Sequence, residues 1–540
     1  MKRTAVLISA GVLFAAGCTS PEDSPWFTAD WQRELDAAQD NPVTLPEGPS
    51  VQPSDDADWL DVKLASDGPV LLSVEDAVVL AMRRNRDLTV QTFSPVIAGT
   101  FERIERGVFD PVAFAEFEYG EETASEIDRG TGTRFNVEDR TTAAAAGITQ
   151  DLPTGTAVEM SVEQNRDTSN RTPEQQDARL GLTVTQQLLR GAGPAVNLVS
   201  IRQAQLDAEA SRYELQGFAE ALLAEVESAY WRYALAQENT AIFTESRDLS
   251  RRQRDEVDER IKIGVLAEAD AAVAYAEVAL REQALINARS DEADQRLRLL
   301  RLLNLTGDEA HGWSQPITVT SPPAVEALPI DDLADRQQLA EQSRPDLAEA
   351  RLRLEQDRLE TIVTRNGVLP QLELFMAIGK TGFADRFDDS FQELEGDSYD
   401  LAAGIRFSKL LGNDAALARR DAAYASRAQS AAAIDNLRQL IALDLQLAAN
   451  ELERARQQIQ ASATTRAMQE KVVAAERERF EAGDSTALLV AQAQRDLLEA
   501  QINEVAAVIA YRLGLIDLYL AEGTLLQRRG FSVSPSPPPR

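Results

Sequence analysis

The sequence has little of the residue types that carry most enzyme chemistry. It contains one cysteine and one histidine among 540 residues, and aromatic residues make up only 6%. His311 lies in a stretch rich in Gly and Pro and has no partner motif. The usual nucleophile, zinc-peptidase and nucleotide-binding patterns are absent. We therefore predict no catalytic residues, no cofactor and no metal site, and the chain is not expected to be an enzyme.

Positive charge and long apolar runs are also scarce. The chain has 55 Lys and Arg residues against 88 Asp and Glu residues, with a formal net charge of −33. Nucleic-acid surfaces need clustered Lys and Arg, so DNA and RNA are not expected partners. Beyond the N-terminal signal, no stretch approaches the ~20 apolar residues of a membrane-spanning helix. If the mature chain crosses a membrane, it must do so as a closed β-barrel.

The single cysteine lies at the end of a predicted export signal. Lys2 and Arg3 form a basic start, and the almost wholly apolar stretch 5–16 follows. The small residues before Cys18 resemble a bacterial lipobox. We therefore predict that residues 1–17 are a signal peptide and that Cys18 is the lipid attachment site. The alternative is an ordinary signal peptide that is cleaved nearby, with Cys18 incidental.

Two kinds of periodicity follow in the chain. Residues 18–72 are polar and Pro-rich, which predicts an N-terminal periplasmic segment without its own core. A helix is expected to begin after Ser73. Apolar and polar residues then alternate, first in Val112–Tyr119, and this period of two predicts barrel strands in about 110–190.

From Pro194 the apolar residues recur at intervals of three and four, which predicts very long helices. The first tract reaches Lys262, Gly264 interrupts it, and a second helix is expected from about Glu268 to Leu303. About 65 helical residues would span roughly 100 Å, far more than a globular domain needs. The pattern therefore indicates a long helical hairpin with its tip near 264.

The same order of elements occurs twice, which indicates an internal duplication. Arg260–Gly264 has a counterpart in Arg479–Gly483 within an equally long helical tract. The predicted organisation is repeat 1 at 73–305, a linker at 306–330, repeat 2 at 331–523 with barrel strands in about 370–408 and a hairpin tip near 483, and a disordered tail at 524–540.

These elements resemble the outer membrane efflux protein family, the TolC-like outer membrane factors, over roughly Leu72–Gly523. The pieces that carry the resemblance are Leu72–Ala77, Gln186–Gly191 and Glu478–Gly483, together with their order and spacing. The resemblance implies a mainly α fold with β-strands, in which a long coiled-coil helical tunnel continues a transmembrane β-barrel shared by three subunits. Open sheet edges are not tolerated in lipid, so the physics also requires several copies to close the barrel.

The function implied by the resemblance is an exit duct for small molecules. The subunit would be lipid-anchored in the cell outer membrane, extend into the periplasm, and work with a periplasmic adaptor protein and an inner-membrane transporter. A duct of the same fold for type I protein secretion or polymer export is an alternative. A periplasmic coiled-coil scaffold lipoprotein is another, but it should lack the strands at Val112–Tyr119 and Leu401–Phe407.

The resemblance also points to the hairpin tips as the site where an adaptor docks, and to the positions just after them as the tunnel constriction. The alternative for each Arg is a solvated helix-end charge, and for Asp270 a carboxylate favoured by the helix dipole. Leu489 and Gln492 stand where relatives with a closed tip carry carboxylates, so a looser or apolar constriction is expected. The candidates are Arg260, Gly264, Val265, Arg479 and Gly483 for docking, and Asp270, Leu488, Leu489 and Gln492 for constriction.

The sequence pattern allows two interpretations of the number of strands in repeat 1. An additional alternating run at Thr141–Gln164 predicts four strands where the resemblance implies two, which would give a wider barrel. Alternatively, these residues form a folded extracellular insertion.

Overall fold

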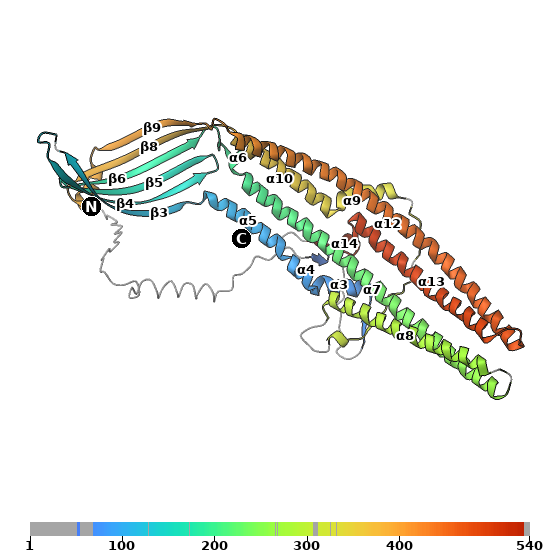
Figure 1. Ribbon diagram of the computed structural model, residues 1–540. Helices are drawn as coiled ribbons and strands as arrows, with labels where there is room; N and C mark the ends of the chain where they lie inside the picture. Colours follow the sequence, from blue (N-terminus) through green and yellow to red (C-terminus); the bar gives the residue numbers. More distant parts are fainter. Residues whose placement is uncertain are drawn as a thin grey trace, which may run out of the picture. The chain divides into compact units, whose positions relative to one another are not determined.

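A computed structural model describes residues 51–53, 69–127, 129–171, 173–264, 266, 268–305, 312–323, 326–330 and 332–533, all within one compact unit, Gly48–Pro537 (Figure 1). The predicted signal peptide, Cys18, His311 and Val265 lie outside these described residues.

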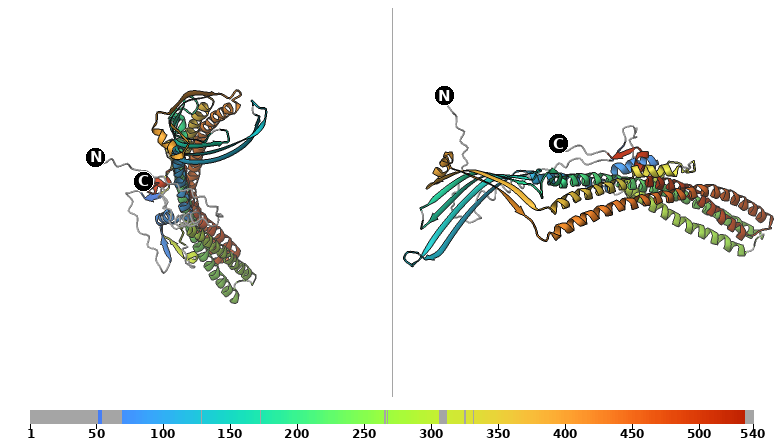
Figure 2. Two further views of the ribbon diagram at one scale, coloured as in Figure 1. Left: turned by 90° about the vertical axis from the view of Figure 1, so that its left-hand side faces the viewer. Right: turned by 90° about the horizontal axis from the view of Figure 1, so that it is seen from above.

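Six antiparallel strands form a single curved sheet (Figure 2). Four strands come from the first half of the chain and two from the second, so the alternating run at Thr141–Gln164 forms sheet strands and not a separate insertion. A short helix, α11 (Phe387–Gln392), lies between the last two strands in sequence. In sheet order the strands are β3 (Val112–Ile127), β4 (Arg134–Leu152), β5 (Thr156–Ser169), β6 (Gln175–Gln187), β8 (Gln371–Ala384) and β9 (Tyr399–Ser408).

One face of this sheet is apolar across all six strands. Residues that pair directly across antiparallel strands lie on the same face. Met160 pairs with Leu182, and Leu182 pairs with Ile378, so the apolar residues of successive strands form a continuous band. Large side chains of this band are exposed to the surroundings, among them Phe117, Ile148, Met160, Leu182, Met376, Ile378, Leu401, Ile405 and Phe407.

The opposite face of the sheet carries paired charges. Arg179 donates two hydrogen bonds of 3.1 Å to the carboxylate of Asp400, and lies 3.2 Å from a carboxylate oxygen of Glu163. Arg406 lies 3.0 Å from Glu373 on the neighbouring strand. A sheet with one apolar and one charged face is the arrangement expected of a barrel that has lipid outside and water inside.

Two very long helical hairpins make up most of the remaining described residues. Within each hairpin the shorter second helix packs side by side with the C-terminal part of the longer first helix. None of the helices among the described residues combines the length and apolar character needed to cross a bilayer. The first hairpin consists of α7 (Val199–Lys262), preceded by the short α6 (Pro194–Asn197), and α8 (Glu268–Leu303), and the second of α12 (Asp414–Ala482) and α13 (Ala487–Glu522).

Shorter helices pack beside these hairpins. Asn85 lies between α3 (Val74–Arg84) and α4 (Arg86–Gln91). Its side chain caps α4 by accepting a hydrogen bond of 3.0 Å from the Leu88 N–H. In the second half, Pro345 occupies the first turn of its helix, where its missing N–H costs nothing. The remaining helices of this group are α5 (Phe93–Arg106), α9 (Leu333–Ser343) and α10 (Pro345–Gly367).

Two small sheets fix the middle of the hairpins. Strand β2 (Val70–Leu72) pairs in parallel with β7 (Ile317–Val319), which lies in the predicted linker. Tyr230 and Tyr233, both buried on α7, donate hydrogen bonds of 3.0 and 2.7 Å to the carbonyls of Leu72 and Ile317. The segments before and after the first hairpin's helices, which hold β2 and β7, are thereby attached to the same helix.

The predicted disordered tail at 524–540 is wrong for residues 524–533. Leu525–Arg528 forms α14, whose Leu525 and Leu526 are buried. Strand β10 (Phe531–Val533) pairs antiparallel with β1 (Val51–Pro53). These elements are only four and three residues long, so their sequence carries no detectable period, and they are ordered by packing on α7 and by strand pairing.

Candidate functional site

Both hairpins reverse direction at a glycine in the left-handed conformation. Gly264 has φ of +80° between α7 and α8, and Gly483 has φ of +85° between α12 and α13. Only glycine adopts this geometry without steric cost, which is why both helices end there. Apart from the chain neighbours, no atom of the described residues lies within 4 Å of the Cβ position at either glycine, so the conformation alone requires the residue type.

At the second tip, hydrogen bonds pair backbone groups that the two helix ends leave without a partner inside the helix. The Asp484 N–H donates a hydrogen bond of 2.9 Å to the carbonyl of Arg479, and the Gly483 N–H donates one of 3.2 Å to the carbonyl of Phe480. The Thr486 hydroxyl accepts a hydrogen bond of 3.4 Å from the Leu489 N–H and caps α13. The turn is therefore defined by its own backbone and caps.

The two tips contact each other through Arg260. Its guanidinium lies 5.1 Å from the ring centroid of Phe480 on the other hairpin, and it forms an ion pair of 2.7 Å with Glu256 on its own helix. Arg479, the equivalent residue of the second tip, is 68% exposed and lies 3.5 Å from Glu476. The two predicted docking arginines therefore differ: Arg260 joins the hairpins, whereas Arg479 projects from the surface.

The predicted constriction residues lie at the starts of α8 and α13. Leu488, Leu489 and Gln492 are exposed on the first turns of α13. The backbone of Asp270 lies in the first turn of α8, and its side chain is outside the described part of the structure. Their role in constriction stays a prediction.

Sequence reasoning missed a buried ionic cluster between the hairpins. Glu277 and Arg281 on α8 are each only 7% exposed and lie 2.6 Å apart, and Arg495 of α13 lies 3.6 Å from Glu277. The spacing of four between Glu277 and Arg281 is visible in the sequence, but such pairs are usually solvated. Only the packing of α13 against α8 shows that this pair is buried.

The two helices of the first hairpin are joined by a contact that involves a tyrosine. The Tyr275 hydroxyl on α8 donates a hydrogen bond of 3.0 Å to Asp258 on α7. This hydrogen bond raises the pKa of Tyr275, because the phenol must keep its proton to donate to the carboxylate. The Arg254 guanidinium lies 5.8 Å from the centre of the same ring. These contacts connect α7 and α8 close to the tip.

Comparison with known proteins shows which proteins share this architecture. Residues 337–524 match the family model described as outer membrane efflux protein. No curated protein sequence matches the chain significantly. Several solved structures share its fold, and outer-membrane channels are among them.

The outer-membrane channel OprN is 18% identical, with 89% of this chain and 98% of that chain covered and a TM-score of 0.63. The CmeC outer membrane channel of Campylobacter jejuni is 14% identical, with 88% and 94% covered and a TM-score of 0.59. The outer membrane protein VceC of Vibrio cholerae is 15% identical, with 83% and 96% covered and a TM-score of 0.60.

The chain thus has the fold of the TolC-like outer membrane channels. The resemblance to the outer membrane efflux protein family is confirmed over residues 337–524, and the solved structures share the fold of the chain as a whole. This family is a class of channel proteins and not a class of enzymes.

Proposed function

We propose that the chain is one subunit of a trimeric outer-membrane duct through which small molecules leave the cell as part of a tripartite pump. The observation that carries this proposal is the six-stranded sheet, because its continuous apolar face is exposed and its opposite face is charged. Such a sheet is stable in a bilayer only as part of a closed barrel.

The edges of the sheet support assembly with other copies. Strand β3 and strand β9 each have one neighbour in the six-stranded sheet. Three copies joined edge to edge would give a barrel of three times six strands. Barrels of about 16–18 strands are wide enough to leave an aqueous channel.

Helix α5 supports the same assembly. Its large apolar residues recur at intervals of four and three on one face and remain about half exposed: Phe93, Ile97, Phe101 and Ile104. A stripe with this spacing is typical of a helix whose apolar side packs on another helix. In the proposed trimer, a neighbouring copy covers this stripe.

The proposed partners follow from the family resemblance. A periplasmic adaptor docks at the tips around Arg260, Gly264, Arg479 and Gly483, an inner-membrane transporter supplies the energy, and Cys18 carries the lipid anchor. The scaffold alternative is disfavoured, because a periplasmic coiled coil has no need for a sheet with an exposed apolar face.

The test is single-channel recording of the purified, detergent-extracted protein in planar bilayers, alongside its native mass. A trimer with discrete, long-lived conductances is the expected result. A non-conducting rod that stays soluble without detergent would overturn the channel and support the scaffold.

A further inference from the structure

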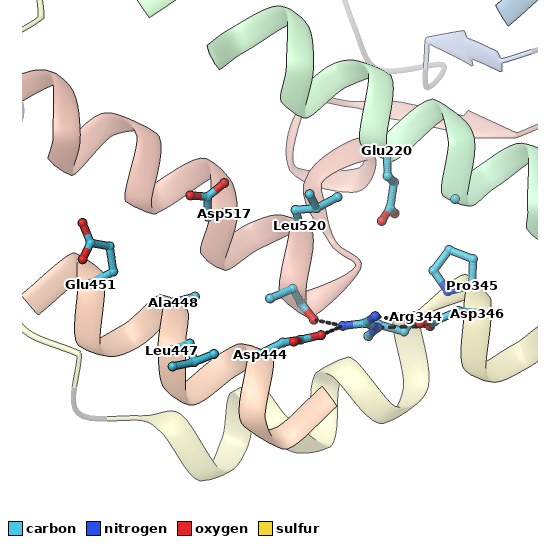
Figure 3. A pocket seen from close by; sticks show the side chains of 12 residues that line it. Glu220, Arg344, Pro345, Asp346, Asp444, Leu447, Ala448, Glu451, Asp517 and Leu520 are labelled. Carbon is cyan, nitrogen blue, oxygen red and sulfur yellow. Dashed lines mark hydrogen bonds and ion pairs between the residues drawn. The ribbon is translucent and has the colours of Figure 1, made fainter. Parts of the chain in front are cut away.

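A cavity of about 610 Å³ lies where four helices meet in the middle of the hairpins (Figure 3). Its lining comes from α7, the start of α10, α12 and α13. Pockets that bind small molecules commonly measure about 300–1,000 Å³, so this cavity has the size of a ligand site.

Arg344 is the one basic residue in this lining, and its guanidinium is already engaged. It lies 2.6 Å from Asp346 and 3.1 Å from Asp444, and it donates a hydrogen bond of 3.4 Å to the carbonyl of Ala521. Glu451, a third acidic residue of the lining, lies 2.5 Å from Arg454. These three carboxylates therefore already have cationic partners.

Two further carboxylates of the lining have no such partner. Among the described residues, no Arg or Lys forms an ion pair with Glu220 or Asp517. Glu220 is only 3% exposed, its side chain points into the cavity in Figure 3, and its hydrogen-bond partner is the neutral amide of Gln216. Burial raises the pKa of Glu220 to about 7. Asp517 is an exposed residue of the lining, and partial desolvation raises its pKa. Arg344 attracts the Glu220 carboxylate and Arg232 attracts that of Asp517, but neither arginine forms a direct ion pair with it, so a cation in the cavity would stabilise the ionised form of both carboxylates.

The rest of the lining is apolar. Leu447 and Ala448 of α12 and Leu520 of α13 face the same space as the carboxylates. A small inorganic ion would leave these surfaces without a partner. A molecule with both a positive charge and an apolar body would contact both kinds of surface.

We propose that this cavity binds an organic ammonium ion, with its charged nitrogen at Glu220 and Asp517 and its apolar body against Leu447 and Leu520. The proposal goes beyond the channel function, because binding here does not depend on conduction. An ammonium group could also come from a Lys side chain of a second copy of this chain, and the experiment separates these two sources.

The test uses the full-length, detergent-solubilised protein and the fluorescent primary amine dansylcadaverine as the probe. Fluorescence anisotropy measures binding at pH 8, where Glu220 is ionised. The N-acetylated, uncharged form of the probe serves as the ligand control. Glu220→Gln removes the charge while keeping the size of the side chain. Glu225→Gln is the matched control, because Glu225 is exposed on the same helix and does not line the cavity.

We expect saturable binding to the wild type and to the Glu225→Gln variant, with an affinity at least tenfold lower for Glu220→Gln and for the acetylated probe. Native mass should be the same in all three proteins. Equal binding to Glu220→Gln, or equal binding of the acetylated probe, would overturn the proposal. A lower oligomeric state of Glu220→Gln alone would also overturn it, because the cation would then belong to a second copy. Circular dichroism spectra verify that each variant is folded.

Discussion

Arg529 donates two hydrogen bonds of 2.6 Å, one to each carboxylate oxygen of Glu227. Glu227 lies on α7 and its side chain is completely buried. The pair therefore attaches the C-terminal segment to a helix some 300 residues earlier in the chain. Parallel hydrogen bonds of this kind are the strongest form of ion pair between side chains.

Replacing Arg529 by Ala should destabilise the protein by about 3–5 kcal/mol, because it leaves a buried carboxylate without its partner. Thermal and urea unfolding followed by circular dichroism measure this loss. The matched control is Arg251→Ala, which removes an exposed ion pair with Glu282 and should cost about 1 kcal/mol or less. A loss for Arg529→Ala as small as that of the control would show that the pair does not hold the segment.

This contact is also an example of a feature that could not be predicted from the sequence. The hairpin tips at Gly264 and Gly483 could be predicted, because a long helical period interrupted by glycine has one simple local explanation. The strands could be predicted because an alternation of apolar and polar residues is local as well. The partner of Arg529 could not, because no local pattern links it to Glu227.

The burial of Glu220 in the cavity and the contact of Arg260 with Phe480 could not be predicted for the same reason. Glu220 is one of many acidic residues on long helices, and only the packing of four helices shows that it is buried. Arg260 could be named from its position near the tip, but its contact with Phe480 depends on how the two hairpins pack.

The buried Glu220 should make stability fall as pH rises. The pKa of Glu220 is raised from 4.5 to about 7 in the folded protein, so the folded state holds the proton more tightly than the unfolded state. Stability is therefore lost between pH 4.5 and about 7, as the carboxylate ionises in its buried position. The charges that face it are Arg344 just before α10, Asp346 on α10, Asp444 and Glu451 on α12 and Asp517 on α13.

Glu220→Gln should remove about 3 kcal/mol of this pH dependence. Urea unfolding from pH 4.5 to 8.5 measures it as the difference from the wild type, so that the other titrating groups cancel. The variant should match the wild type at the acidic end and exceed it at pH 8. Parallel curves for the two proteins across the whole range would contradict the prediction.

Two glycines with similar backbone conformations should respond differently to alanine. At Gly483 the added Cβ meets no neighbour, so the cost is the left-handed conformation alone, about 1–2 kcal/mol. At Gly523, where φ is +67°, the Cβ would lie 2.9 Å from the Cα of Arg344, so a steric clash is added and the total should reach about 3 kcal/mol or more. Thermal unfolding of the two variants should rank Gly523→Ala as clearly the less stable, and the reverse order would contradict the packing.

The contact of Arg260 with Phe480 should hold the two tips together. Arg260→Ala removes a cation–π contact with an energy of about 0.5–1 kcal/mol, so amide exchange near Phe480 should become about two- to fivefold faster. Hydrogen exchange followed by mass spectrometry measures this change. Arg479→Ala is the control, because Arg479 is exposed and its contact stays within its own helix. Equal acceleration in both variants would mean that the contact does not couple the hairpins.

Substitutions at two neighbouring residues of β9 should have different effects, because the two side chains lie on opposite faces of the sheet. Ile405 lies on the exposed apolar face, whereas Arg406 points to the other side, where it pairs with Glu373. Ile405→Arg places a charge toward lipid at a cost of about 2–4 kcal/mol at mid-membrane, so the amount of protein in the outer-membrane fraction should fall sharply. Arg406→Gln should insert normally, and its conductance should favour cations more strongly, because Glu373 loses its counter-charge. Membrane fractionation and reversal potentials in a salt gradient measure the two effects. Normal insertion of Ile405→Arg would place that face away from lipid and remove the main support for a barrel.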